Sequence, residues 1–458
     1  MRIVILGAGQ VGGTLARNLA REENDITLID LDESKLRDLG HRLDIQTVHG
    51  SGSHPSVLIE AGIEQADMLI AVTNSDEINM MGCQIAYSLF RTPMKIARIR
   101  SQHYYNYPEL FHKDHVPVDV CISPEKLITE HIQNLIDYPG ATQVFEFGDG
   151  LLLMVTIKLA ADSTMVDQKL SALHQKLTQI DFRIITIFRN NTAIAPNRDT
   201  KLQVDDLILF IAPPQAIQHI MIVLGCYAPP NRRIIIAGGG HIGSQLAQTL
   251  ESSYRIKVID HNSNRTMDLA SQLNRGTVLQ GDIADCDLLI NENIEFTDVF
   301  CAVTDDDEAN IMSCLQAKRL GVRQAMALVN RHAYVELIKD SAIDQAISPQ
   351  LITIGCILAK LRGGHMVKVH RLQNGEAEAI ELITHGDHYT SHVVGRRLDE
   401  IEIPPSCIIA AIIRDNKPLL ASPELIIESD DHVILLLLKR RYIRQLETLF
   451  QVTLTFMN

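Results

Sequence analysis

The chain has 458 residues, of which 46% are hydrophobic and 21% charged, a composition typical of several globular domains. Its formal net charge of −14 argues against sequence-independent nucleic-acid binding, which requires a surplus of lysine and arginine along one face. The sequence predicts no membrane span, because no apolar run approaches the length of about 18 residues that a spanning helix needs.

The chain opens on a predicted strand, glycine turn and helix. Ile3–Leu6 is a short apolar run, and Val11–Ala20 carries apolar residues at helical spacing. Between them the glycine motif is made of Gly7, Ala8, Gly9, Gln10, Val11 and Gly12. Its first glycine allows a tight turn, its second lets the backbone approach a pyrophosphate, and its third lets the helix pack against the strand. The motif therefore predicts a nucleotide site at a helix N-terminus.

An acidic residue completes this motif. Asp30 ends the second apolar run, Ile26–Ile29, and lies 18 residues past Gly12. A carboxylate in this position accepts hydrogen bonds from ribose hydroxyls and repels a 2′-phosphate. The sequence therefore favours NAD or an adenine nucleotide over NADP. The simpler alternative is a solvated acid at the end of a strand.

The loop after the next predicted strand, Leu69–Val72, is polar from Thr73 to Glu77. Its acids follow hydroxyl and amide side chains, as is typical of a helix N-cap. Because loops at the carboxyl edge of a parallel sheet face the ligand crevice, Thr73 and Asn74 are also candidates for ligand contact.

Two arginines alternate at the end of the predicted strand Ile96–Ile99. Arg98 and Arg100 are two residues apart, so strand geometry directs both to the same side of the sheet. Arginines are rarely buried without a partner. The pair therefore predicts a phosphate or an acid nearby.

The same features return 231 residues later. A second glycine motif is made of Gly238, Gly239, Gly240, His241, Ile242 and Gly243. Asp260 matches Asp30 after the loss of one residue, and Thr304 and Asp305 match the first copy's loop. Further residues at the same offset are Gly50, Asp67, Asn79 and Cys83. So many independent matches indicate an internal duplication.

The second copy differs from the first at the strand-end arginines. Leu328 and Asn330 occupy their positions, and Arg331 lies one step further on. The two sites are therefore predicted to differ in ligand preference. The run Asp305–Asp307 gives only weak support for a metal, so neither a metal site nor a catalytic residue is predicted.

Each copy is predicted to contain two lobes. Alternating strands and helices predict an α/β fold with a Rossmann-like parallel sheet in the larger lobe. Apolar runs such as Leu151–Leu159, separated by polar turns, predict a small α+β lobe with a mostly antiparallel sheet. The predicted boundaries are 1–137 and 138–227 in the first copy and 232–362 and 363–452 in the second.

The duplicated pattern closely resembles the RCK (KTN) family, and within it the peripheral subunits of bacterial Trk potassium uptake systems. The resemblance covers essentially the whole chain and is carried by Ile5 through Gly12, Thr73 through Glu77 with Asn79, Ala302 through Ser313, Val394-Gly395-Arg396 and Glu428 through Asp431. It implies two tandem Rossmann-like RCK N-lobes, each followed by a small RCK C-lobe, and a regulatory protein that is not an enzyme.

The resemblance also implies ligands, partners and a location. Members of the family bind NAD(H) and adenine nucleotides such as ATP and ADP. They assemble as a ring, expected here as a homotetramer, on the cytoplasmic face of the bacterial inner membrane. The ring contacts an integral-membrane Trk potassium-translocating subunit, and its ligand state gates transport. By the resemblance, one nucleotide would be held by Gly7–Val11, Asp30, Thr73, Asn74 and Arg98, and another by Gly238–Ile242, Asp260, Thr304 and Asp305.

Two other functions stay open from the sequence. An NAD-dependent oxidoreductase would need a substrate domain with an acid or base near the cofactor, for which the small lobes offer no obvious candidate. A nucleotide-sensing subunit of a different ion channel would carry the same motifs, and only the identity of its membrane partner would separate it from a Trk subunit.

Overall fold

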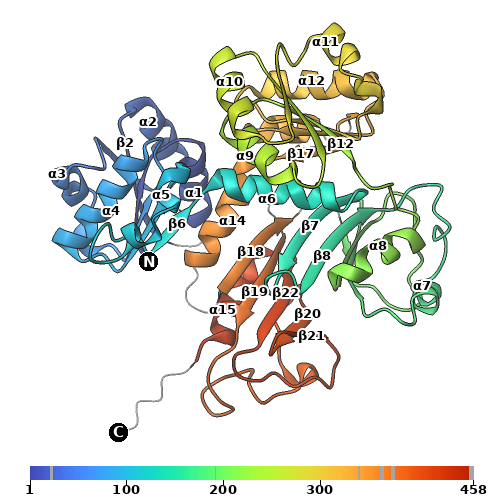
Figure 1. Cartoon of the computed structure of the whole chain (residues 1–458). Coiled ribbons are helices and arrows are strands. Elements are labelled where there is room, and N and C mark those ends of the chain that lie inside the picture. The colour runs from blue at the N-terminus through green and yellow to red at the C-terminus, as the bar shows by residue number, and fades with distance from the viewer. Residues whose placement is uncertain (21–23, 191, 339–340, 362–365, 373–376, 453–458) are drawn as a thin grey trace. The chain divides into compact units, whose positions relative to one another are not determined.

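The computed structural model describes the chain apart from residues 21–23, 191, 339–340, 362–365, 373–376 and 453–458 (Figure 1). The described chain divides into two compact units. One contains Met1–Leu127 with Ile352–Ile357, and the other contains Ile128–Leu351 with Leu358–Asn458. Among the described residues, no helix combines the length and the apolar character needed to cross a membrane. The predicted lobe boundaries stay predictions, and the one between 362 and 363 lies outside the described residues.

The first unit is built on a six-stranded parallel sheet in the order β3-β2-β1-β4-β5-β6. Its strands are β1 (Arg2–Leu6), β2 (Asp25–Asp30), β3 (Gln46–His49), β4 (Met68–Ala71), β5 (Met94–Arg98) and β6 (Val120–Ile122). Its helices are α1 (Gln10–Ala20), α2 (Glu33–Arg42), α3 (Pro55–Glu60), η1 (Ile63–Gln65), α4 (Asp76–Phe90), α5 (Gln102–Tyr105) and η2 (Pro108–Phe111), and α6 (Pro124–Asp137) continues into the second unit. This strand order is that of a doubly wound dinucleotide fold.

Both faces of the first parallel sheet are buried. Val4 and Leu6 belong to one core cluster together with Cys83 and Ala86 of α4. Ile5 points to the opposite face and is also fully buried. Burial on both faces explains why the strands appear in the sequence as continuous apolar runs and not as alternating ones.

The second unit contains a copy of this sheet, in the order β14-β13-β12-β15-β16-β17. Its strands are β12 (Arg233–Ala237), β13 (Arg255–Asp260), β14 (Thr277–Gln280), β15 (Val299–Ala302), β16 (Gln324–Leu328) and β17 (Gln345–Ile347). Its helices are α9 (His241–Leu250), α10 (Ser263–Gln272), α11 (Cys286–Asn291), η3 (Ile294–Phe296), α12 (Asp307–Arg319) and α13 (His332–Leu337), and α14 (Pro349–Leu361) follows, with its residues Ile352–Ile357 assigned to the first unit. The predicted pair of Rossmann-like parallel sheets is confirmed.

Two five-stranded antiparallel sheets complete the second unit, as predicted for the small α+β lobes. The first, in the order β10-β9-β11-β8-β7, is made of β7 (Ala141–Phe147), β8 (Leu152–Lys158), β9 (Arg183–Arg189), β10 (Thr192–Ile194) and β11 (Leu207–Ala212), with helices α7 (Leu170–Lys176) and α8 (Pro214–Val223). The second, in the order β18-β19-β22-β20-β21, is made of β18 (Met366–Leu372), β19 (Ala377–Ile383), β20 (Cys407–Arg414), β21 (Lys417–Leu420) and β22 (His432–Leu437), with η5 (Leu398–Glu400), η6 (Arg440–Tyr442) and α15 (Ile443–Phe450).

The two antiparallel sheets share one core. Residues of both belong to a single buried cluster, and their positions match at an offset of 225 residues. Two of the matched positions are large in the first sheet and small in the second, where Ala379 matches Met154 and Ala410 matches Ile185. The shared cluster shows that the two sheets pack face to face.

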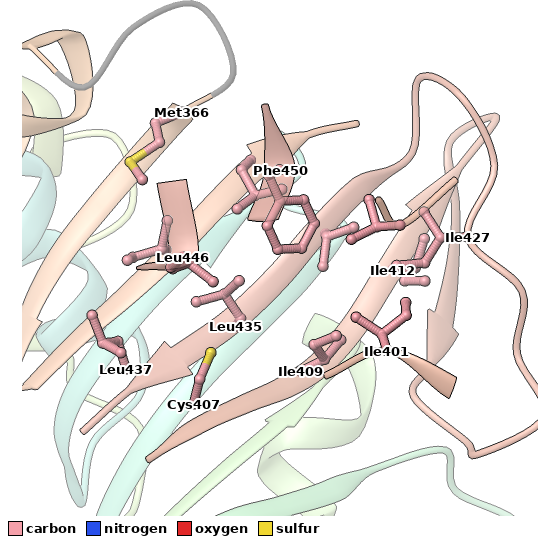
Figure 2. Packing of buried hydrophobic residues seen from close by; sticks show 14 of the residues in the cluster. Met366, Ile401, Cys407, Ile409, Ile412, Ile427, Leu435, Leu437, Leu446 and Phe450 are labelled. Atoms are coloured by element: carbon pink, nitrogen blue, oxygen red, sulfur yellow. The ribbon is translucent and has the colours of Figure 1, made fainter. Parts of the chain in front are cut away.

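The second antiparallel sheet is also covered on its other face (Figure 2). Leu435 and Leu437 of β22 belong to a separate cluster with Leu446 and Phe450 of α15. Leu436, between them, points to the shared core. This double burial explains the uninterrupted apolar run of β22.

Candidate functional site

The first glycine motif forms a tight turn between β1 and α1. Gly7 has a φ of +103°, a conformation that favours glycine, and its amide donates to the Ile29 carbonyl oxygen at 2.8 Å. A Cβ at Gly12 would lie 1.8 Å from the Gly7 carbonyl oxygen. Only glycine at this position lets α1 start so close to the strand.

The second glycine of the motif borders open space. A Cβ added at Gly9 would meet no atom within 4 Å, and the same holds for Gly240 in the second copy. The first turn of the following helix presents backbone amides that lack intrahelical acceptors, together with the positive end of the helix dipole. Backbone that can be approached closely, beside a helix N-terminus, fits a phosphate group.

The second copy repeats the turn with the same dimensions. Gly238 has a φ of +110°, and a Cβ at Gly243 would again lie 1.8 Å from the carbonyl oxygen of the turn glycine. Of the other predicted residues in the two motifs, Ala8 and Gly239 are buried, Val11 and Ile242 are partly buried, and Gln10 and His241 are exposed.

Asp30 closes the first glycine turn. Its carboxylate accepts hydrogen bonds from the Ala8 amide at 2.5 Å and from the Asp32 amide at 2.8 Å. Each carboxylate oxygen has a second lone pair, so the group can still accept from a ribose hydroxyl. The sequence predicted only the ribose role, and the structure adds that Asp30 holds the turn in place.

Asp260 makes the matching contacts in the second copy. It accepts from the Gly239 amide at 2.7 Å and from the Asn262 amide at 2.8 Å, and only 3% of its surface is exposed. Arg265 lies 3.8 Å from its carboxylate. Asp260 is therefore not a solvated acid, and a cation partly balances its charge.

Thr73 lies beside the first glycine turn. Its backbone nitrogen would be 3.1 Å from a Cβ at Gly7, and its hydroxyl donates to Asn79 Oδ1 at 2.7 Å. Asn74 next to it is exposed. In the second copy, Thr304 occupies the position beside Gly238, and Asp305 is exposed.

Helix capping occurs as predicted after both strands. The Ser75 hydroxyl accepts from the Ile78 amide at 3.2 Å, and the Asp306 carboxylate accepts from the Ala309 amide at 2.9 Å. Asp76, in the first turn of α4, is buried and accepts from the Arg100 amide at 3.0 Å. The predicted acidic loop is thus tied to the next strand as well.

The role of Asn79 was not predicted from the sequence. This residue is fully buried, and its amide group donates to the Arg98 carbonyl oxygen at 2.8 Å while its carbonyl accepts from the Thr73 amide at 3.0 Å. Asn310 makes the same contacts to Leu328 and Thr304. A buried amide in the same helical position of both copies was the available signal, since such groups need hydrogen-bond partners.

The strand-end arginines of the first copy meet an acid. Arg98 lies 3.8 Å and Arg100 lies 3.5 Å from the same Glu125 oxygen. Burial and the neighbouring Arg100 lower the pKa of Arg98 to about 10. Two guanidinium groups thus share one carboxylate at the end of β5, and the buried Asp76 is a further negative charge that acts on Arg98.

The second copy has no such cluster at the matching positions. Leu328 is apolar and buried, and the Asn330 side chain donates to Asp307 at 3.0 Å. Arg331 forms an ion pair at 2.9 Å with Glu308, which raises the pKa of that guanidinium. The two sites therefore differ in charge where their phosphate ends are predicted.

A metal site is not apparent in the described part of the chain. Among those residues, no group of three or more histidine, cysteine, aspartate or glutamate side chains could hold an ion. The acids of the run Asp305–Asp307 are used for capping and for contacts to backbone amides. What the sites offer is a set of backbone amides, a carboxylate beside each glycine turn and, in the first copy, a pair of arginines at the end of β5.

Comparison with known proteins gives matches along the whole chain. The TrkA-N domain model matches residues 3–124 and 234–349, and the TrkA-C domain model matches residues 154–224 and 388–451. The chain is 49% identical over 456 residues to the Trk system potassium uptake protein TrkA of Halomonas elongata, with 100% of both chains covered. It is 46% identical over 452 residues to the protein of that name from Vibrio alginolyticus, with 98% and 99% covered.

A solved structure shares the fold at low sequence identity. The GsuK channel bound to NAD is 18% identical, and the alignment covers 98% of this chain and 78% of that chain with a TM-score of 0.61. The likeness therefore extends through all four sheets and is not limited to the glycine turns.

Proposed function

The chain belongs to the TrkA family of Trk-system potassium uptake proteins, and from this premise we propose that it is a regulatory, non-enzymatic subunit whose ligand state controls potassium transport. Its proposed ligand is NAD(H), and ATP and ADP, which share the adenosine part, would compete for the same crevices. The proposed assembly is a ring of four copies on the cytoplasmic face of the bacterial inner membrane. There it would contact an integral-membrane Trk potassium-translocating subunit.

One observation carries the nucleotide part of this proposal. In both copies the space over the second glycine is unfilled, and a carboxylate is fixed beside the turn by two backbone amides. Phosphates would accept from the amides of the helix N-terminus, and the ribose hydroxyls would donate to Asp30 or Asp260. A turn built only for packing would not need free space at Gly9 and Gly240.

In the proposed mechanism, the ligand selects one arrangement of the ring. Thr73 borders the crevice, and Asn79 links it to α4 and to the end of β5. A ligand that contacts the loop at Thr73 would favour the arrangement of the ring in which this loop, α4 and the end of β5 fit the ligand better. It can shift the equilibrium only by its difference in affinity for the two arrangements.

Binding by a Gly9→Ala variant tests the nucleotide site. The methyl group meets no protein atom, so the melting temperature should stay close to that of the parent. NADH affinity should fall at least about tenfold, because the methyl group occupies the space that the pyrophosphate needs. Isothermal titration of NADH, NAD, ATP and ADP measures this, and Gly240→Ala makes the same test in the second copy.

The carboxylate is tested with Asp30→Ala and Asp260→Ala. Each should weaken binding in its own copy by about 10- to 100-fold, the range expected for lost hydrogen bonds to a charged group. Unchanged NADH affinity in Asp30→Ala, Asp260→Ala and both glycine variants would contradict the proposed site.

Potassium flux tests the regulatory part separately. The protein is added to proteoliposomes that contain the Trk membrane subunit, and flux is measured with and without each nucleotide. We expect the nucleotide to change the flux, and the change to be lost in the glycine variants. If no nucleotide changes the potassium flux, the proposed control of transport is contradicted, even if the nucleotides bind.

A further inference from the structure

A broad groove lies at the amino edge of the second parallel sheet, away from the glycine turn. It encloses about 1250 Å³, more than the usual volume of a small-ligand pocket. Its lining includes five cationic and three acidic side chains together with the half-exposed ring of Phe296. The five cations are Arg232, Arg233, Arg255, Lys257 and Arg275.

The acids of the groove are already occupied by the protein itself. Glu251 accepts from the backbone amides of the loop before β14, including that of Arg275 at 2.8 Å. Asp298 accepts from the Arg232 amide at 2.7 Å, and Glu292 pairs with Lys257 at 2.7 Å. Only Glu292 pairs with a cation of the lining, and five positive charges less three negative ones leave the groove with a formal charge of +2.

The side chains of the four arginines are placed differently from the acids of the groove. All are exposed, and no ion pair or side-chain hydrogen bond is observed within the described residues for Arg232, Arg233, Arg255 or Arg275. Arg233 and Arg255 are also direct neighbours on the adjacent strands β12 and β13. Like charges on neighbouring strands repel each other, so the protein alone gains nothing from this pairing.

The first copy shows that the fold does not require these arginines. Asp25 holds the position of Arg255, beside Arg2 on the neighbouring strand, which gives that copy an opposite-charge pair. Asp44 holds the position of Arg275, as the alignment of the third strands of the two sheets shows. The basic character of the groove is therefore a property of the second copy only.

We infer that this groove binds a soluble anion that carries two or more phosphate groups. Guanidinium groups match phosphate oxygens in pairs, and several of them converge on one concave surface. An anion would also relieve the repulsion between Arg233 and Arg255. Phe296 offers a face on which a ring attached to the phosphates could stack. This site is separate from the glycine turns, and the inference does not depend on nucleotide binding there.

A tryptophan reporter gives a local measurement of binding. The chain contains no tryptophan, so Phe296→Trp introduces a single emitter into the groove. Tripolyphosphate is titrated into this variant at low salt while its emission is recorded. We expect a saturable change in emission whose apparent affinity falls steeply as salt is added. Binding only at the glycine turns would leave the emission unchanged.

Charge reversal then tests the arginines. Arg255→Asp with Arg275→Asp installs the residues that the first copy carries at these positions, and should weaken tripolyphosphate binding at least about 100-fold. The milder variant Arg275→Gln should weaken it about tenfold, and is used if the double variant does not melt cooperatively. Asp25→Arg with Asp44→Arg in the first copy is the matched control and should leave the reporter titration unchanged.

The comparison ligands decide the chemistry. Vesicles of phosphatidylglycerol present the same phosphate chemistry on a surface, and hexaglutamate presents carboxylates. A response to vesicles but not to tripolyphosphate would overturn the soluble anion, and equal saturation by hexaglutamate would overturn the phosphate assignment. A reporter that does not respond to tripolyphosphate, or that responds equally after charge reversal, would overturn the site itself.

Discussion

In the first copy of the parallel-sheet domain, Asn79 joins Thr73 to the end of β5, and in the second copy Asn310 joins Thr304 to the end of β16. The glycine turns and the acids that close them also agree. The side chains around these shared elements differ between the two copies. Arg98 is matched by Leu328, and two exposed acids at the amino edge of the first sheet are matched by arginines in the second.

The comparison separates two kinds of residue. The glycines that allow the turn, and the aspartates and asparagines that hold it, are the same in both copies, because changing them would create a clash or leave buried groups without partners. Several side chains around them differ in charge. The residues that fix the backbone therefore define where a ligand can bind, and the side chains around them define which ligand binds.

The largest expected effect is a loss of stability in either copy when the third glycine is replaced. Gly12→Ala and Gly243→Ala each place a methyl group 1.8 Å from a carbonyl oxygen of the turn. We expect each to lower the free energy of unfolding by more than about 3 kcal/mol, because backbone on both sides must move. Urea unfolding followed by circular dichroism measures this.

Gly9→Ala and Gly240→Ala are the matched controls for this clash, since their methyl groups meet no atom within 4 Å. They should unfold at nearly the urea concentration of the parent. If all four variants were equally stable, or if only one copy were sensitive, the two turns would not be equivalent frames.

The second largest expected effect is the loss of stability when the buried asparagine side chain is removed. Asn79→Ala leaves the Thr73 amide and the Arg98 carbonyl without partners in a dry environment, and Asn310→Ala does the same in the second copy. Each should cost about 2–3 kcal/mol. Hydrogen exchange at the Thr73 and Thr304 amides measures the local effect, and protection that survives both substitutions would contradict it.

The shared frame was largely predictable from the sequence. The repeat offset and the glycine spacing predict two parallel sheets with their turns, and the strands carrying Leu6 and Leu69 are continuous apolar runs. The surroundings were not predictable in the same way. Glu125 is far in sequence from the arginine that it pairs with, and nothing in its neighbourhood marks it as a partner.

The small lobes show a second limit of sequence reasoning. The strand within Leu151–Leu159 was predicted, but β7 was not, since its run Ala141–Phe147 mixes polar and apolar residues. Its burial arises from the opposite sheet. A pattern within one strand carries no information on which other sheet will cover it.

The next expected effect is a loss of stability in the first copy alone, at its arginine cluster. Glu125→Gln installs the residue type that the second copy has at position 350, but removes the carboxylate that Arg98 and Arg100 share. We expect a loss of about 2 kcal/mol, less than for a fully buried pair because the cluster retains some exposure. Urea unfolding with and without ADP measures it.

Added ADP should recover part of this loss if phosphates contact the arginines, because an anion then replaces the missing carboxylate. The triple variant Arg98→Leu, Arg100→Asn, Glu125→Gln copies the neutral arrangement of the second copy. It should be closer to the parent in stability than the single variant. A single variant as stable as the parent would mean that the cluster does not need its acid.

We expect the free energy of unfolding to change with pH by about 1–2 kcal/mol, and this change to depend on a residue that differs between the two small lobes. Phe145 and His370 hold matching positions in them, and their rings stack at 4.7 Å. Burial lowers the pKa of His370 to about 3, with Lys368 adding to the effect, and burial lowers the pKa of His131 to about 4. In the unfolded chain these imidazoles take up protons near pH 6.5.

Because the folded state binds fewer protons, its stability should fall as the pH drops from about 6.5 toward 4. His370→Phe makes the second lobe like the first and should flatten this dependence, measured as the melting temperature between pH 7 and pH 5. His112, whose side chain is 73% exposed, is the control position, and His112→Gln should change nothing. Equal slopes for the parent and His370→Phe would contradict the assignment.

The smallest expected effect concerns the ribose end of the two sites. In the first copy, α2 is capped by Asp32, whose pKa is lowered to about 2 by hydrogen bonds from Ser34 and Lys35. In the second copy, α10 is capped by the neutral Asn262, and Arg265 lies 3.8 Å from Asp260. A 2′-phosphate would therefore meet two carboxylates in the first site, where Lys35 lies 3.2 Å from Asp32, but only one carboxylate, with Arg265 nearby, in the second.

Exchanging the two caps tests whether this charge difference discriminates between ligands. Asp32→Asn should leave stability unchanged, because asparagine and aspartate cap helices equally well. It should raise the affinity of the first site for NADPH relative to NADH by up to about fivefold, the scale of an exposed charge interaction. Asn262→Asp should lower the same ratio in the second site, with each titration performed in a background that carries Gly9→Ala or Gly240→Ala in the other copy. Ratios that do not move in opposite directions would contradict a role of the two caps in discriminating between NADPH and NADH.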